Sequence, residues 1–178
     1  MSTMDGVMAA NLPEAAQAAE PGFSSRDFRD AMGRFASGVV VISTSTPEDG
    51  HHAMTANAFM SGSLTPALVV VSVAHAARMH DRIQQAGWFG ISILSHEQRH
   101  VSNHFAGKPC QESPPVFDML GQGPVVAGAV MQLGAKLRHA YACGDHTLFV
   151  GEVTALKLPE QCASPLVYYS GRYNRLAE

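Results

Sequence analysis

The sequence predicts a mainly β protein built on an antiparallel barrel with a few flanking helices. Several segments have strand character and only two or three have helical spacing, and the two kinds do not alternate as a doubly wound parallel sheet requires. Two long strand-like segments, residues 131–141 and 147–158, are separated by Gly144-Asp145, which is typical of a hairpin turn. These observations favour consecutive antiparallel strands.

The composition is that of a single globular domain that acts on small molecules or proteins. The chain has 178 residues, with 12 basic and 15 acidic side chains and a net charge of -3, so it lacks the basic footprint of a protein that binds nucleic acid or anionic membrane. Its three cysteines are widely spaced and form no CxxC pair, which disfavours a disulfide framework or a cysteine zinc site and fits a reducing compartment. No segment has the length of a membrane span. We therefore expect a cytoplasmic protein with no nucleic-acid and no membrane partner.

The first 23 residues predict a flexible arm ahead of the domain, which would occupy residues 24–178. This segment is rich in alanine, is closed by Pro21-Gly22, and has neither the basic start nor the sustained apolar block of a secretory signal.

The first predicted elements are a helix and a β-hairpin. Ser24 or its neighbour can cap a helix to about residue 36, because Phe28, Met32 and Phe35 recur at helical spacing. Residues 39–46 are rich in β-branched side chains, and the turn that follows leads to a second strand.

The next segment joins a polar turn of small residues, 54–64, to an apolar strand, 67–73. The strand is almost entirely small or β-branched, which predicts burial on both of its faces. Thr55 and Asn57 lie in the turn and offer short hydrogen-bonding groups to a ligand. An ordinary turn leading into a core strand would have the same pattern.

The middle of the chain predicts a helix over residues 76–86 ended by Gly87, a strand over 89–94, and a helix from Ser95 to Phe105. Residues 107–124 are rich in proline, glycine and polar groups and predict a surface loop. The first long strand of the last third alternates apolar and polar residues, so we expect one wet face, and residues 166–169 form the closing strand.

Common catalytic and metal motifs are missing from the sequence. There is no Rossmann glycine pattern, GxSxG elbow, Walker lysine or HExxH sequence. His96, His100 and His104 would lie on one helix face, but they would span roughly 12 Å, too far for one ion to reach all three. We expect a solvated polar face there and no metal.

Two C-terminal segments leave a ligand-binding and a structural interpretation open. In GDHTLFVGEV, Asp145 can fix a turn that holds His146 at the start of a strand, and Gly151 marks a close approach by a ligand or by the protein itself. In YYSGRY, the aromatic rings and Arg172 can hold a planar or phosphorylated ligand, or belong to the core.

Seven segments, taken in chain order, carry a family resemblance: FRDAMGRFASGVVVIST, MTANAFMSGSL, residues 68–73, GWFGISIL, His104-Phe105-Ala106, GDHTLFVGEV and PLVYYSGRY. Together they make the chain, from about residue 24 to 176, similar to the flavin reductase family, the small reductase components of two-component flavin-dependent monooxygenases. The resemblance implies a split β-barrel homodimer that binds FMN or FAD near the subunit interface.

The resemblance also implies an activity. Hydride would pass from NADH or NADPH to the flavin, and the reduced flavin would be supplied to a partner monooxygenase. The alternative is a split barrel that binds flavin or haem without reductase turnover.

The family's site residues can be placed by position in this sequence. The resemblance implies that the segment His51, His52, Ala53, Met54, Thr55, together with Asn57 and Ala58, contacts the flavin ring and ribityl chain. Ser72, Val73 and Ala74 would meet the ring through backbone groups. Arg78 and Met79 occupy the phosphate position, where Arg78 would replace the family's usual Ser or Thr by a charge. Phe105 would pack near the cofactor. His146, Arg172 and Tyr173 would shape the nicotinamide side, and His146 alone is assigned a catalytic role.

Overall fold

The computed structural model of the protein describes residues 22–109, 114–159 and 163–176. The predicted N-terminal arm lies almost entirely outside these residues, as do Cys110 and Cys162. The helical elements are α1 (Ser25–Met32), α2 (Arg78–Ala86), the short 3-10 helix η1 (His96–Gln98) and α3 (Arg99–Phe105).

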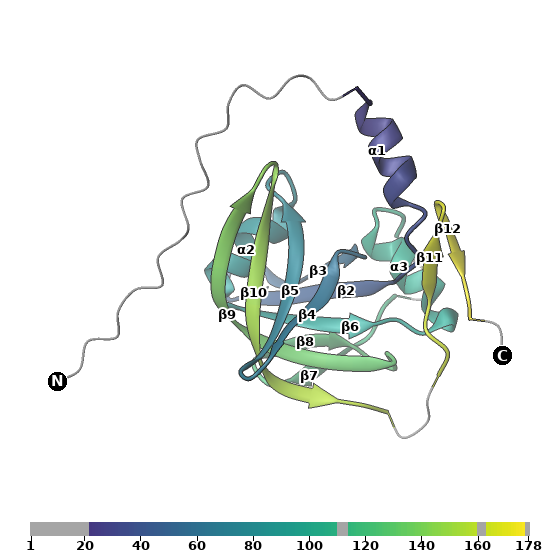
Figure 1. Cartoon of the computed structure of the whole chain (residues 1–178). Coiled ribbons are helices and arrows are strands. Elements are labelled where there is room, and N and C mark those ends of the chain that lie inside the picture. The colour runs from purple at the N-terminus through teal and green to yellow at the C-terminus, as the bar shows by residue number, and fades with distance from the viewer. Residues whose placement is uncertain (1–21, 110–113, 160–162, 177–178) are drawn as a thin grey trace.

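The strands form three antiparallel sheets, which confirms the predicted fold class (Figure 1). The main sheet has seven strands in the order β3 (Gly50–Ala56), β2 (Val40–Thr46), β6 (Trp88–Ile93), β9 (Met131–Cys143), β10 (His146–Lys157), β5 (Ala67–Ala74) and β4 (Phe59–Leu64). A three-stranded sheet contains β1 (Ser37–Gly38), β11 (Val167–Tyr169) and β12 (Arg172–Asn174). A hairpin contains β7 (Phe117–Leu120) and β8 (Gly123–Val126).

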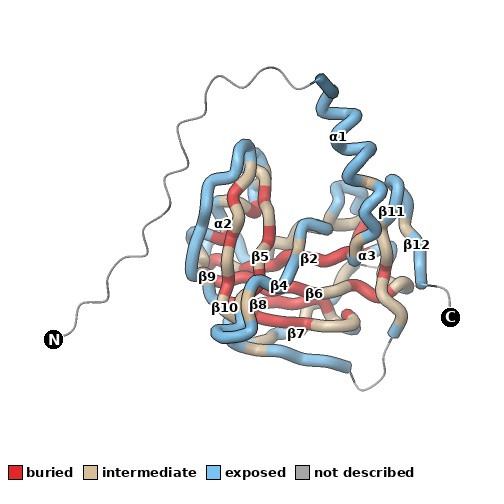
Figure 2. Tube along the Cα trace, in the orientation of Figure 1, coloured by how far each residue is buried: buried red, intermediate tan, exposed pale blue. Residues whose placement is uncertain are grey.

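The seven-stranded sheet curves around one core but is split between its two outer strands. β3 and β4 are joined directly by Asn57 and Ala58, yet they lie at opposite ends of the hydrogen-bonded order. The main core is lined by side chains of β2, β5, β6, β9, β10 and α2, and Figure 2 shows the buried residues concentrated in these strands. The sheet is therefore open between β3 and the pair β4–β5, and at this opening β5 extends past the end of its pairing with β4, so that its last residues border the gap toward β3.

Gly151 belongs to the core and not to a ligand contact, which decides between the two interpretations left open above. A Cβ atom at this position would lie 2.5 Å from Phe89 Cζ and 2.8 Å from the Cβ of Ala135. Both neighbours are fully buried. The glycine therefore allows β10 to pass over the Phe89 ring.

Helix α1 is shorter and more exposed than the sequence predicts. Ser24 is the N-cap, as expected, and its hydroxyl accepts a hydrogen bond from the Asp27 N–H at 3.2 Å. The helix ends at Met32, however, with Gly33 as its C-cap, so Phe35 lies beyond it. The apolar face contains no buried residue (Figure 2).

The predicted polar turn over residues 54–64 is wrong in most of its length. Met54 to Ala56 complete β3, and residues 59–64 form the edge strand β4, so that only two residues make the connection. β5 is also buried on one face only: Val69, Val71 and Val73 are buried, and the residues between them are half-buried. The β-branched residues of β5 predict two buried faces, but the second face borders a groove and is only half-buried.

Three other expectations are corrected. The predicted loop over residues 107–124 contains β7 and the start of β8. The predicted helix from Ser95 begins as the 3-10 helix η1. β9 has no continuous wet face: it is largely buried where β6 pairs with it and mostly exposed where it extends past Leu137.

Candidate functional site

Three cavities meet at Asn57, in the gap between β3 and β5. The apolar groove, of about 780 Å³, lies between the end of α1 and the outer face of β4, β5 and β10. The α1 cavity, of about 760 Å³, lies between α1 and the β11–β12 hairpin. The Thr55 cavity, of about 190 Å³, is lined by Thr55, Ser102 and Tyr173. Asn57 lines all three, and its carboxamide forms no hydrogen bond with any described residue.

The end of β5 presents free backbone groups at this gap. β4 pairs with β5 only as far as Val71, after which the Ser72 N–H donates to the Ala58 carbonyl at 3.1 Å. Backbone groups of alternate residues in an antiparallel strand point to the same side, so the Ala74 N–H points where β4 has already ended. Ser72 and Ala58 also line the apolar groove. The site therefore offers hydrogen-bond donors for the polar edge of a planar ligand and, beside them, an apolar wall for its flat face.

The Thr55 cavity is shaped by hydrogen bonds between distant segments. The Thr55 hydroxyl donates to the Ser102 carbonyl at 2.8 Å, and the Ser102 hydroxyl lies 2.9 Å from the Tyr173 hydroxyl. The Arg99 guanidinium lies 5.3 Å from the centre of the Tyr173 ring. Ser102 and Arg99 were not identified from the sequence, because only the fold brings α3 against β12.

The predicted contact segment 51–55 is divided between the two faces of β3. Met54 packs against the main core, whereas Ala53 packs against a second core that includes Phe105. His51 follows the same alternation as Ala53 and stacks on the edge of Phe117, at 5.8 Å between ring centres. One flat molecule cannot contact the side chains of both faces.

Arg78 and Met79, which are predicted to hold a phosphate group, lie at the start of α2. Arg78 is exposed there, whereas the Met79 side chain is fully buried in the main core, so only the Met79 backbone is available to a ligand.

Burial lowers the pKa of His52 below its usual range, and the charges of Arg82 and Arg78 lower it further, while Asp49 opposes them. Arg82 itself pairs with Asp49 at 2.9 Å.

The charged neighbours of His52 predict how a substitution would change its pKa. Arg82→Met is expected to raise the pKa of His52, because the variant removes one cation and frees the Asp49 carboxylate to attract the proton. Histidine NMR titration of the two proteins measures it, with Arg175→Met as a control that removes a charge at the chain's other end. An unchanged His52 midpoint would contradict the assignment.

The same shift fixes the sign of a stability effect. The folded chain binds the His52 proton less tightly than the unfolded chain, whose pKa is about 6.5. Protonation therefore favours unfolding as the pH falls below about 6.5, and this loss of stability levels off below the folded-state pKa.

His146 is the first residue of β10 and lies opposite Ala74 in the strand pairing. Its Nδ1 is 2.7 Å from the Asp145 carboxylate, and this hydrogen bond lowers the pKa of Asp145. The Asp145 carbonyl accepts the His75 N–H at 3.0 Å, so the turn that carries His146 is tied to the end of β5.

Two further histidines missed by the sequence reasoning converge on the Thr147 hydroxyl. His80 Nε2 lies 2.9 Å and His75 Nε2 lies 3.2 Å from this oxygen. No local pattern could have shown this contact, because the partners are 67 and 72 residues apart.

The remaining predicted residues fall outside this centre. Arg172 is exposed in β12 and lines none of the three cavities.

The described residues contain no group of three or more potential metal ligands, and His96 lies in η1 apart from the helix that holds His100 and His104. No helix within the described ranges is long and apolar enough to cross a membrane.

Comparison with known proteins shows which family the chain resembles. A family model described as flavin reductase like domain matches residues 32–177. An NADH-dependent flavin reductase of a Rhodococcus species is 40% identical over 167 residues, which are 93% of this chain and 94% of that protein.

Two other proteins give the same relationship. The reductase component of 4-hydroxyphenylacetate 3-monooxygenase from Thermus thermophilus is 40% identical over 149 residues, 84% of this chain and 95% of that protein. Among solved structures, flavin reductase PheA2 in its native state has a TM-score of 0.81 and 44% identity, and the match covers 88% of this chain and 100% of that one.

Proposed function

Because the chain belongs to the flavin reductase-like family and is an NAD(P)H-dependent flavin reductase, we propose that the groove around Asn57 binds its flavin. The enzyme transfers hydride from NADH or NADPH to FMN or FAD and supplies the reduced flavin to a partner monooxygenase. The observation that carries the site assignment is the free edge of β5 beside an unpaired carboxamide and an apolar wall.

The residues at this gap fit a flavin ring. Asn57 and the Ala74 N–H supply hydrogen-bonding groups for its polar edge, and the apolar groove, with Phe59 and Leu148, supplies a wall for its flat face. Arg78 lies beyond Ala74, where its cation would hold the flavin phosphate.

The protein's part in catalysis is to position the two rings. The bound flavin supplies the acceptor for the nicotinamide hydride. Asn57 and the β5 edge orient one ring, and His146, held by Asp145, limits where the other can lie. A donor at the Ala74 N–H favours negative charge developing on the ring edge.

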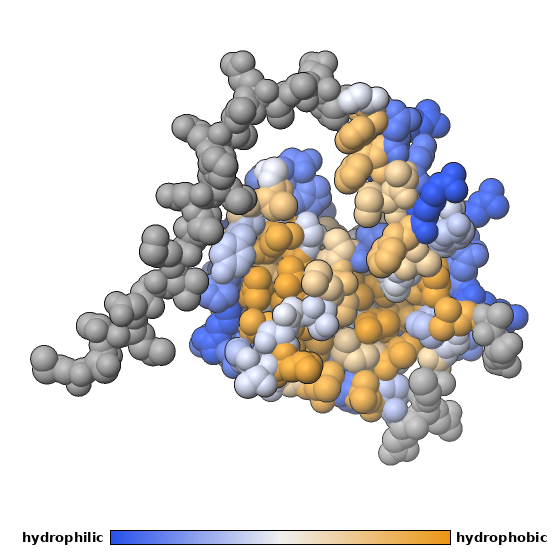
Figure 3. Space-filling model, in the orientation of Figure 1, coloured by the Kyte–Doolittle hydropathy of each residue, from blue (hydrophilic) through white to orange (hydrophobic). Residues whose placement is uncertain are grey.

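We further propose that the protein is a cytoplasmic homodimer. Phe28, Met32 and Phe35 are 54–75% exposed, and Met60 on β4 is 61% exposed. Figure 3 shows apolar side chains gathered over the face between α1 and the strands. Exposed apolar surface of this kind favours association. Light scattering on the purified protein tests it, and a monomer at all accessible concentrations would refute the dimer.

The function is tested by steady-state oxidation of NADH and NADPH with added FMN or FAD. We expect turnover with at least one pairing and release of reduced flavin. Tight flavin binding with NADH oxidation at the background rate would instead support a binding protein.

His146→Ala is expected to impair use of the nicotinamide more than binding of the flavin, because His146 is assigned to the nicotinamide side of the site. We expect KM for NADH to rise about tenfold and the flavin Kd to change less than about twofold. Steady-state kinetics and fluorescence titration with FMN measure these effects. Equal losses in both would place His146 elsewhere.

A further inference from the structure

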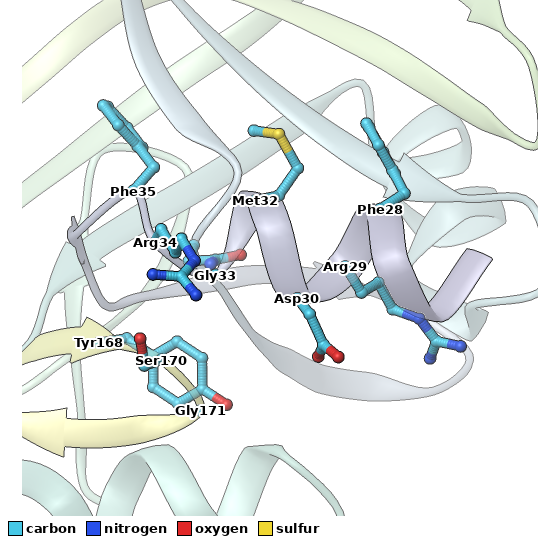
Figure 4. A pocket seen from close by; sticks show the side chains of 11 residues that line it. Phe28, Arg29, Asp30, Met32, Gly33, Arg34, Phe35, Tyr168, Ser170 and Gly171 are labelled. Carbon is cyan, nitrogen blue, oxygen red and sulfur yellow. The ribbon is translucent and has the colours of Figure 1, made fainter. Parts of the chain in front are cut away.

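The α1 cavity has a charged wall and an aromatic wall that the flavin assignment does not use. Arg29, Asp30 and Arg34 line one side, and Tyr168 and Ser170 line the other. In Figure 4 the Arg34 side chain points toward the β11–β12 hairpin, and Asp30 and Arg29 project from the same side of the segment, while Phe28, Met32 and Phe35 point the opposite way. The charged side chains therefore form the part of the lining nearest the hairpin, and Met32 and Phe35 form its border with the apolar groove.

The two walls are held together by the backbone. The Ser170 N–H donates to the Gly33 carbonyl at 2.8 Å, which ties the tip of the hairpin to the end of α1. Ser170 and Gly171 both have positive φ, 47° and 75°, the conformation of a tight two-residue hairpin turn. The cavity is thus bounded by two elements with a fixed connection.

The charged wall favours an anion. The lining contains two arginines, Arg29 and Arg34, and one aspartate, Asp30, which lies 3.9 Å from Arg26. Arg34 forms no ion pair with any residue in the described ranges. A guanidinium with free donors is suited to bidentate binding of phosphate oxygens.

The aromatic wall favours a planar base. The Tyr168 ring is half-buried and packs edge-on against Tyr173, with 5.5 Å between ring centres and 62° between planes. This contact limits the orientations of the ring beside the cavity. A base can stack on such a ring while a diphosphate reaches the guanidinium.

We propose that the α1 cavity binds the adenosine diphosphate half of the nicotinamide dinucleotide, with Arg34 on the diphosphate and Tyr168 beside the adenine. The proposal rests on the flavin reductase function stated above. The cavity adjoins the flavin groove, since Asn57, Met32 and Phe35 line both.

The same adenosine diphosphate group occurs in FAD, but the geometry favours the nicotinamide dinucleotide. The flavin phosphate is assigned to Arg78, which follows Ala74 at the start of α2. In Figure 1, α2 lies behind β5, β9 and β10, on the other side of the molecule from α1 and the β11–β12 hairpin, which bound the α1 cavity. A flavin whose phosphate lies at α2 directs its chain away from α1, which leaves the α1 cavity to the other substrate.

Kinetics with truncated substrates test the proposal. NADH and reduced nicotinamide mononucleotide differ by the adenosine monophosphate half, and FAD and FMN differ in the same way. With FMN as acceptor, Arg34→Met is expected to reduce the KM advantage of NADH over the mononucleotide by about tenfold. Arg26→Met, in α1 but outside the cavity lining, is expected to retain it.

A binding measurement gives a second readout that does not depend on turnover. Calorimetry with ADP on the wild-type protein in the presence of FMN should detect binding, and Arg34→Met should weaken it. An unchanged NADH advantage in Arg34→Met, or a loss confined to FAD relative to FMN, would overturn the proposal. Failure of the wild-type protein to oxidise NADH with any flavin would instead refute the enzymatic function.

Discussion

Phe89→Ala is expected to lower the free energy of unfolding by about 3–5 kcal/mol, the largest stability effect we predict. The Phe89 side chain is fully buried in β6, which pairs with β2 on one side and β9 on the other. Gly151 lies directly against the Phe89 ring and has no side chain, so it cannot fill the space that removal of the ring leaves. Urea denaturation followed by circular dichroism measures the change.

Phe23→Ala is the matched control, because it removes the same ring from a site that is 56% exposed. We expect it to change the free energy of unfolding by less than about 0.5 kcal/mol. If Phe89→Ala does not fold, Phe89→Leu should show a smaller loss of the same sign. Equal stabilities for the two alanine variants would contradict the core assignment.

Asn57→Leu is expected to raise KM for the flavin about tenfold, the largest effect on activity that we predict for one side chain of the groove. The substitution keeps a similar volume but removes every hydrogen-bonding group of the carboxamide. Asn57 lines all three cavities and is exposed, so the loss should appear in binding and not in folding. Steady-state kinetics with FMN and with FAD, together with thermal denaturation, separate the two.

Asn174→Leu makes the same chemical change in β12, at an exposed position that lines none of these cavities. We expect its flavin KM to stay within about twofold of wild type. A flavin KM that is unchanged in Asn57→Leu would move the flavin away from the gap between β3 and β5.

Local signals in the sequence located several element boundaries. Gly87 ends α2 with a φ of 63°, Gly144 makes the β9–β10 turn with a φ of 61°, and Ser24 caps α1. Each signal depends on a few neighbouring residues, whose backbone preferences act in the same way in any fold.

Burial was harder to predict because it depends on partners that are distant in sequence. The β-branched run of β5 indicated two buried faces, but the face that contains Val70 borders the apolar groove. The alternation in β9 indicated one wet face, yet β6 covers only its first half. Periodicity reports which side chains share a face, and the neighbouring strands decide whether that face meets water.

The sequence by itself determined the antiparallel β class, the order of its hairpins and the family motifs that indicate flavin chemistry. Only the tertiary structure decided how those motifs meet. It placed Asn57 beside the free edge of β5, divided His51 and His52 between two faces of β3, and brought Ser102 against Tyr173. These contacts join segments tens of residues apart, and chain closure and packing fix them where local preference cannot.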